Sequence, residues 1–195
     1  MQALVSLASA VDALNNRIGR IVSWLALIMV VVQFAVVLMR YAFGVNSIFL
    51  QESIVYMHAS LFMLGAGYTL LHGGHVRVDI FYRTAPEHKK ALVDLLGSLF
   101  LLLPVCILIT AYSWGFVEQS WSIRESSVET SGIPLVYVLK TLILLFCGVL
   151  ILQGVAMALH SLATLMGRDH LPEEEGLAGF NDLQDIQKQD KNKED

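Results

Sequence analysis

The sequence has little charge, few cysteines and no excess of basic residues. Charged residues make up 15% of the 195 positions, against about 25% in soluble domains. The 13 Lys and Arg are outnumbered by 17 Asp and Glu, so no positive surface is expected to bind nucleic acid. The two cysteines, Cys106 and Cys147, form no CxxC pair, which excludes a disulfide scaffold and gives no indication of a zinc site.

Catalytic motifs are also missing. The sequence has no Ser/His/Asp grouping, no phosphate-binding glycine loop and no nucleotide motif. His72 and His75 have the spacing of two metal ligands on a helix, but the glycines at 73–74 argue against a regular helix there. Asp79 is the one further ligand nearby. We therefore expect no enzymatic activity, no cofactor and no metal site.

Long apolar runs are what the sequence does have. Hydrophobic residues make up 55% of the chain and gather in four segments that are apolar all round, unlike the one-sided helices of a soluble bundle. About 20 helical residues cross a hydrocarbon core of roughly 30 Å. The predicted fold class is an all-α membrane protein with four transmembrane helices at about residues 21–39, 53–72, 92–117 and 135–160.

The distribution of Lys and Arg predicts the orientation. Most of these residues lie before the first span, in the loop 73–91 and after the fourth span, whereas the other two loops hold Arg40 and Arg124. The positive-inside rule then places both termini in the cytoplasm. The first span is expected to be retained, because residues 38–41 do not resemble a signal-peptide cleavage site.

The two ends of the chain differ from the predicted transmembrane domain, residues 21–166. Residues 1–20 carry one apolar stripe at helical spacing, formed by Leu4, Leu7, Val11, Leu14 and Ile18. We predict an amphipathic helix in the cytoplasmic interface, with a partner-binding helix as the alternative. Residues 167–195 hold nine acidic and four basic residues, which predicts a solvated, mostly disordered tail.

Few polar groups lie deep in the spans. Gln33 and Gln153 cannot titrate, and Asp94 lies near a predicted cytoplasmic end. A stand-alone proton-coupled transporter needs a deep carboxylate, so it is the second-ranked interpretation. A membrane cytochrome b is a weaker one, because only His72 and His160 share a predicted depth for two axial haem ligands.

The spans also contain residues suited to helix packing. Gly65 and Gly67 allow close approach of another helix, and Gln33 and Gln153 can form interhelical hydrogen bonds. These contacts fit either the four-helix bundle itself or another subunit. Arg40 and Glu52 fall at the same predicted outer interface, where we expect them to pair.

Residues 40–82 resemble the small membrane subunit of tripartite ATP-independent periplasmic (TRAP) transporters, the DctQ-like family. The resemblance rests on four features. An Arg and an aromatic residue follow the first span, and an acidic residue opens the second span. A Leu-Gly-Ala stretch lies within the second span, and an H-V-R-V-D motif follows it. These are Arg40 and Tyr41, Glu52, residues 64–66, and His75, Arg77 and Asp79 with their neighbours. With four spans and cytoplasmic termini, the likeness covers about residues 18–165.

The resemblance implies a subunit without chemistry of its own in a bacterial inner membrane. It implies a large membrane partner that carries the substrate and sodium sites, and a periplasmic binding protein that delivers an organic acid such as a dicarboxylate or 2-oxo acid. The small subunit would then scaffold the large one in the lipid bilayer. Arg77 has two interpretations, a contact within this assembly or a plain positive-inside anchor.

Overall fold

The protein is described here by a computed structural model that covers residues 2–74 and 86–167. The described residues are helical, without strands. The helices are α1 (Gln2–Ala42), α2 (Ile48–Leu71), α4 (Glu87–Gly97), the π-helical turn η1 (Ser98–Leu102), α5 (Leu103–Ser122) and α6 (Val136–Leu165). His75, Arg77, Asp79 and the acidic tail lie outside the described residues.

The four predicted spans are confirmed as four helices long and apolar enough to cross a membrane. They are α1, α2, the continuous run α4–η1–α5, and α6. The third helix changes to π-helical turns just before Pro104. Proline has no N–H and its ring crowds the carbonyl four residues earlier, so a wider turn at this point relieves the clash.

Helix α1 differs from the prediction of an interfacial arm followed by a separate span. Residues 2–42 form one helix of 41 residues, about 60 Å long at 1.5 Å per residue. No proline interrupts it, and its glycine, Gly19, is accommodated inside the helix. The apolar stripe that predicted the arm is largely exposed, with Leu7 57% and Leu14 47% accessible.

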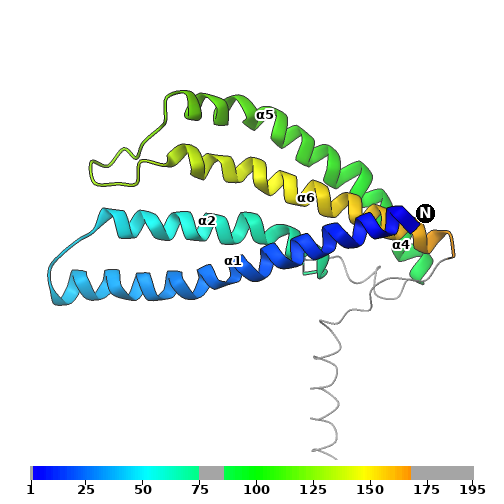
Figure 1. Cartoon of the computed structure of the whole chain (residues 1–195), viewed down its shortest axis with the longest axis horizontal. Helices are drawn as coiled ribbons and strands as arrows, with labels where there is room; N and C mark the ends of the chain where they lie inside the picture. Colours follow the sequence, from blue (N-terminus) through cyan, green and yellow to red (C-terminus); the bar gives the residue numbers. More distant parts are fainter. Residues whose placement is uncertain (1, 75–85, 168–195) are drawn as a thin grey trace, which may run out of the picture.

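Helix α6 is the centre of the bundle. Within the described residues it packs against α1, α2, α4 and α5, while α5 has its main contacts with α6 (Figure 1). In its most apolar stretch 44% of the residues are buried, against 11% for each of the other three spans. A helix at the centre needs apolar residues on every side, and α6 has them.

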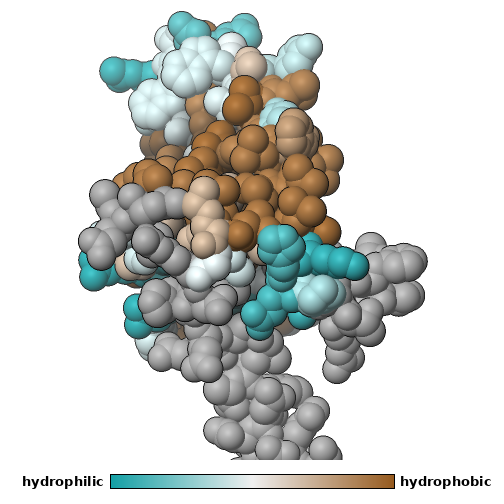
Figure 2. All heavy atoms as spheres, turned by 90° about the vertical axis from the view of Figure 1, so that its right-hand side faces the viewer, coloured by the Kyte–Doolittle hydropathy of each residue, from teal (hydrophilic) through white to brown (hydrophobic). Residues whose placement is uncertain are grey.

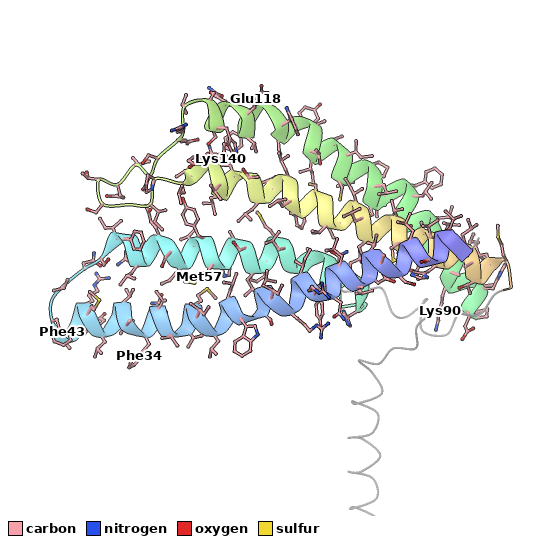
Figure 3. The ribbon with its side chains drawn as sticks, in the orientation of Figure 1. Phe34, Phe43, Met57, Lys90, Glu118 and Lys140 are labelled. Carbon is pink, nitrogen blue, oxygen red and sulfur yellow. The ribbon has the colours of Figure 1, made fainter. Side chains whose placement is uncertain are left out.

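The outer helices leave a broad apolar surface uncovered. Phe34 points from α1 away from the other helices (Figure 3) and is 68% exposed. Seen along the bundle, hydrophobic side chains fill the middle of the molecule, with hydrophilic ones gathered above and below (Figure 2). Such a surface matches lipid or another membrane helix, not water.

The bundle has two ends. We call the end that holds the N-terminus and the last turn of α6 the amino-terminal end, and the end that holds residues 43–47 and 123–135 the loop end (Figure 1). Lys90 lies at the amino-terminal end, while Glu118 and Lys140 lie toward the loop end (Figure 3). Each end has its own cluster of polar side chains.

Candidate functional site

The first cluster joins α1 to α6 at the amino-terminal end. Asn15 Nδ2 donates to Gln153 Oε1 at 2.7 Å, and Gln153 Nε2 donates to Asp12 Oδ1 at 2.8 Å. The other carboxylate oxygen of Asp12 lies 2.8 Å from His160 Nε2. We call Asp12, Asn15, Gln153 and His160 the amino-terminal cluster.

This cluster is buried between helices. Asn15 and Gln153 are 1% and 2% exposed, and the side chains of His160 and Asp12 are 11% and 15% exposed. Small residues make the approach possible: a Cβ on Gly67 of α2 would come within 2.8 Å of Asn15 Oδ1. Buried amides are stable only when hydrogen-bonded, so the network specifies how α1 and α6 meet.

The two histidines that share a predicted depth each have a hydrogen-bond partner within the chain. His160 Nε2 is held by Asp12, and His72 Nδ1 lies 3.0 Å from the carbonyl oxygen of Tyr68 in its own helix. The nitrogen that His160 would offer to haem iron is therefore engaged in the bundle. Among the described residues, no group of three or more His, Cys, Asp or Glu is arranged to hold a metal.

The second cluster begins at Glu52 in the first turns of α2. One oxygen of its carboxylate accepts from the Ser127 hydroxyl, and the other accepts from the Ile133 backbone N–H at 2.5 Å. A side chain at Gly132 would overlap Ser127 and Glu52, so glycine is required for this approach. Glu52 thus ties the α5–α6 loop to α2.

The expected pair between Arg40 and Glu52 is not formed. Elsewhere in the bundle Lys140 pairs with Glu125 and His160 with Asp12. Both oxygens of Glu52 are directed to the loop of residues 123–135, while Arg40 is exposed in the last turn of α1. Arg40 and Glu52 do both lie at the loop end, but the Ser127 hydroxyl and the Ile133 N–H of the loop bond to the two carboxylate oxygens of Glu52.

Glu125 holds the other side of this loop. Lys140 Nζ is 2.5 Å from Glu125 Oε2, and the Ser120 hydroxyl donates to the same oxygen at 2.6 Å. These two donors, Lys140 first, lower the pKa of Glu125 below its usual value of 4.5. The Lys140 ammonium also lies 3.9 Å from the centre of the Phe116 ring. We call Glu52, Ser120, Glu125, Ser127 and Lys140 the loop cluster.

The remaining sequence-predicted residues fall in different environments. Gly67 and Gln153 belong to the amino-terminal contact, whereas a Cβ on Gly65 would meet only the tip of Val22, at 4.0 Å. Gln33 is exposed on α1 and, within the described residues, forms no interhelical hydrogen bond. Gln153 therefore bonds between helices inside this bundle, and the alternative of a contact with another subunit stays open for Gln33.

Sequence reasoning missed Asp12, Asn15 and the Glu125–Lys140 pair. A signal for the first two exists. Small and polar residues recur at helical spacing on a face next to the apolar stripe, about 100° around the helix, and they are Ala8, Asp12, Asn15, Gly19 and Val22. Of these, Ala8, Asn15, Gly19 and Val22 are buried. In a membrane protein, small and polar residues mark the face that packs and large apolar ones the face toward lipid.

Comparison with protein families identifies the chain. Residues 29–165 match the family described as tripartite ATP-independent periplasmic transporters, DctQ component. The chain belongs to the DctQ family. It is 30% identical over 112 residues to a C4-dicarboxylate TRAP transporter small permease protein DctQ of Vibrio cholerae, covering 55% of this chain and 45% of that protein. No solved structure matches the chain.

DctQ membership and the four apolar helices together support a multi-pass protein of the inner membrane that is a component of a TRAP transporter. The family match includes all of the loop cluster and begins after Asp12 and Asn15. Half of the amino-terminal cluster therefore lies inside the matched region and half outside it. The chain spans slightly less than half the length of the curated DctQ relative.

Proposed function

We propose that this chain is the small permease subunit of a sodium-coupled TRAP transporter that imports an organic acid. In this proposal it scaffolds the large membrane subunit, which carries the transport site, while a periplasmic binding protein delivers the substrate. DctQ membership supports the role. The C4-dicarboxylate relative supports a carboxylate substrate.

Gln33 is the observation that carries the scaffold role. It lies about 4.5 Å along α1 from the centre of the predicted span, yet its amide is exposed and unpaired within the described residues. An amide facing hydrocarbon without a partner is costly. A polar group from a neighbouring membrane subunit would remove this cost, as interhelical amide bonds do in other membrane proteins.

Arg40 extends the same face. It is seven residues from Gln33, so the two side chains lie two turns apart on one side of α1, with Val30 and Val37 beside them. Val30 and Val37 are 64% and 42% exposed, and Arg40 is also exposed and unpaired in the described part of the chain. We propose this face of α1, defined by Val30, Gln33, Val37 and Arg40, as the contact with the large subunit.

The test is co-purification from cells that express the tagged chain together with its neighbouring membrane genes. We expect the large subunit to be recovered, and a photo-crosslinker at position 33 to link to it. Gln33→Leu should lower recovery about threefold or more, because one interhelical hydrogen bond is lost. The control is Ile107→Leu on α5, an exposed apolar residue on a different helix.

Two outcomes would overturn parts of the proposal. Recovery of the chain alone, with transport in proteoliposomes, would overturn the scaffold role and favour the stand-alone transporter. Recovery of the large subunit with crosslinks from position 107 and none from 33 would move the contact to α5. Reconstitution of all three components with and without a sodium gradient tests the coupling.

A further inference from the structure

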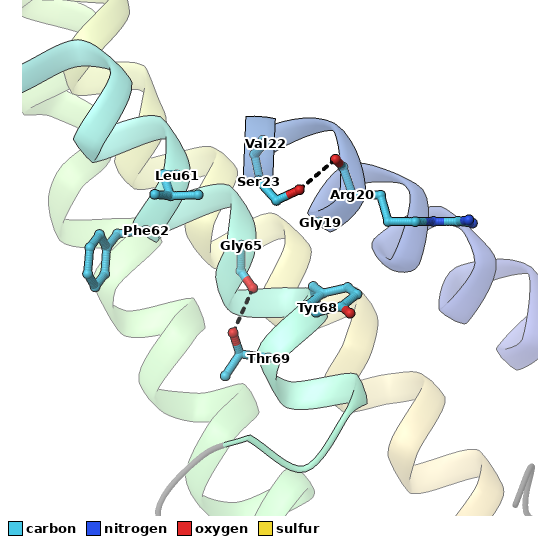
Figure 4. Close-up of a pocket in the computed structure, with 9 residues that line it drawn as sticks. All are labelled: Gly19, Arg20, Val22, Ser23, Leu61, Phe62, Gly65, Tyr68 and Thr69. Carbon is cyan, nitrogen blue, oxygen red and sulfur yellow. Dashed lines mark hydrogen bonds between the residues drawn. The ribbon is translucent and has the colours of Figure 1, made fainter. Parts of the chain in front are cut away.

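A groove of about 330 Å³ opens between α1 and α2 near the amino-terminal end (Figure 4). Two glycines shape it. Gly19 lets the Tyr68 ring lie directly against the α1 backbone, which closes one end. Gly65 leaves the opposite wall empty, with the nearest Val22 methyl 4.0 Å from where a Cβ would stand. The groove is therefore a space between two packed helices, within the usual size range of ligand pockets.

The groove has one apolar and one cationic end. Val22, Leu61 and Phe62 line the part that reaches into the span, while Arg20 extends away from Leu61 and Phe62, beyond Tyr68 (Figure 4). Arg20 directly precedes the charge-free run that starts at residue 21. Its guanidinium has no hydrogen bond or ion pair among the described residues. Arg17, one turn earlier, is also exposed.

Two of the three residues with hydroxyl groups that line the groove use them within their own helices. Ser23 donates to the Arg20 carbonyl at 2.8 Å, and Thr69 donates to the Gly65 carbonyl at 3.0 Å (Figure 4). Both hydroxyl protons are thus used inside their own helices. What remains for a ligand is an apolar channel with the Arg20 cation at its rim and the Tyr68 side chain at the end that it closes.

We propose that this groove binds one anionic phospholipid, with its phosphate near Arg20 and one acyl chain along Val22, Leu61 and Phe62. Basic residues at the membrane end of a crevice between spans are the arrangement that recognises anionic headgroups. The apolar walls favour a lipid over free phosphate, because free phosphate has no acyl chain to fill the apolar part of the groove. By the predicted orientation, the headgroup belongs to the cytoplasmic leaflet. The proposal does not depend on the transport role, because it needs only a bilayer.

Native mass spectrometry of the purified full-length chain tests the site. The probes are phosphatidylglycerol, phosphatidylcholine with the same acyl chains, and inorganic phosphate. We expect phosphatidylglycerol to be retained in preference to phosphatidylcholine, and inorganic phosphate not to displace it. Arg20→Gln should reduce phosphatidylglycerol binding about fivefold, the effect of one surface cation on an anionic lipid.

Two matched pairs of variants distinguish binding in the groove from general effects of net charge and of substitution at this position. Arg40→Gln removes the same charge at the other end of α1 and should leave retention unchanged. Gly65→Leu should fill the groove and reduce binding of both lipids, while Gly65→Ala, whose Cβ meets nothing closer than 4.0 Å, should not. Arg20→Gln adds no side-chain volume between the helices, so the variant should fold. It therefore tests the site even if Gly65→Leu fails to fold.

The proposal is overturned if Arg20→Gln and Arg40→Gln reduce retention equally, because binding would then follow net charge alone. It is also overturned if phosphatidylcholine is retained as well as phosphatidylglycerol, or if a folded Gly65→Leu binds as the wild type does. Occupation of the groove by a helix of the large subunit would appear as loss of lipid retention in the assembled complex, and that too would overturn it.

Discussion

The two polar clusters stabilise the bundle in different ways. The amino-terminal cluster is buried and joins side chains 138 to 148 positions apart in the sequence, on α1 and α6. The loop cluster is partly exposed, and it anchors one connecting loop to the ends of α2 and α6. The first sets the packing of helices, where an unpaired group has no access to water. The second positions a loop, where water can replace a lost partner.

The largest effect is expected from the amino-terminal cluster. Asp12→Leu leaves Gln153 Nε2 and His160 Nε2 without their acceptors. An unsatisfied buried donor costs about 1–3 kcal/mol, so the midpoint of thermal unfolding in detergent should fall by several degrees. Asp12→Asn, which keeps one acceptor, should lose less. Equal midpoints for wild type and Asp12→Leu would show that the cluster does not hold α1 on α6.

The next effect is expected at Glu52. Glu52→Ala removes the acceptor of the Ser127 hydroxyl and of the Ile133 N–H, and it should destabilise the chain less than Asp12→Leu does because water reaches the loop end. The loop of residues 123–135 should become more sensitive to proteolysis, which limited digestion measures. Glu118→Ala, an exposed acid at the same end, is the control. Similar digestion of both variants would contradict the anchoring role.

A smaller, pH-dependent effect is expected at Glu125. Its pKa is lower in the folded chain than the usual 4.5, because Lys140 and Ser120 donate to the carboxylate. The stabilisation is therefore complete above the unfolded pKa and is lost as the pH falls through the folded pKa. Thermal midpoints should decrease more steeply below pH 4.5 for the wild type than for Glu125→Gln. Parallel curves would exclude a contribution from this pair.

The smallest effect on the isolated chain is expected at Arg40. Since Glu52 bonds to the loop, Arg40→Gln should change stability by less than about 0.5 kcal/mol. The same variant should reduce recovery of the large subunit if the proposed α1 face is correct. A large loss of stability in the isolated chain would restore the Arg40–Glu52 pair that the sequence suggested.

Sequence reasoning located the helices well and their contacts poorly. The four spans were predictable because the length and hydropathy of a segment are local properties. Gln153 was also identified, since a deep amide needs a partner. Its partners Asp12 and Asn15 were not, because they lie in a segment whose apolar stripe suggested a surface helix. The stripe described the exposed face of α1, and the packing face carried the weaker pattern of small and polar residues.

The sequence by itself determined that this protein has four segments long and apolar enough to cross a membrane and that it resembles a DctQ subunit, because apolar runs and local motifs can be read without knowing any contact. Only the tertiary structure decided that α6 is the central helix, that residues 2–42 form one helix, and that Glu52 serves the loop and not Arg40. These depend on which of several possible partners comes closest once the helices pack. Segments far apart in the chain then pack closely where a glycine leaves room for a side chain of another segment, and no local pattern specifies these contacts.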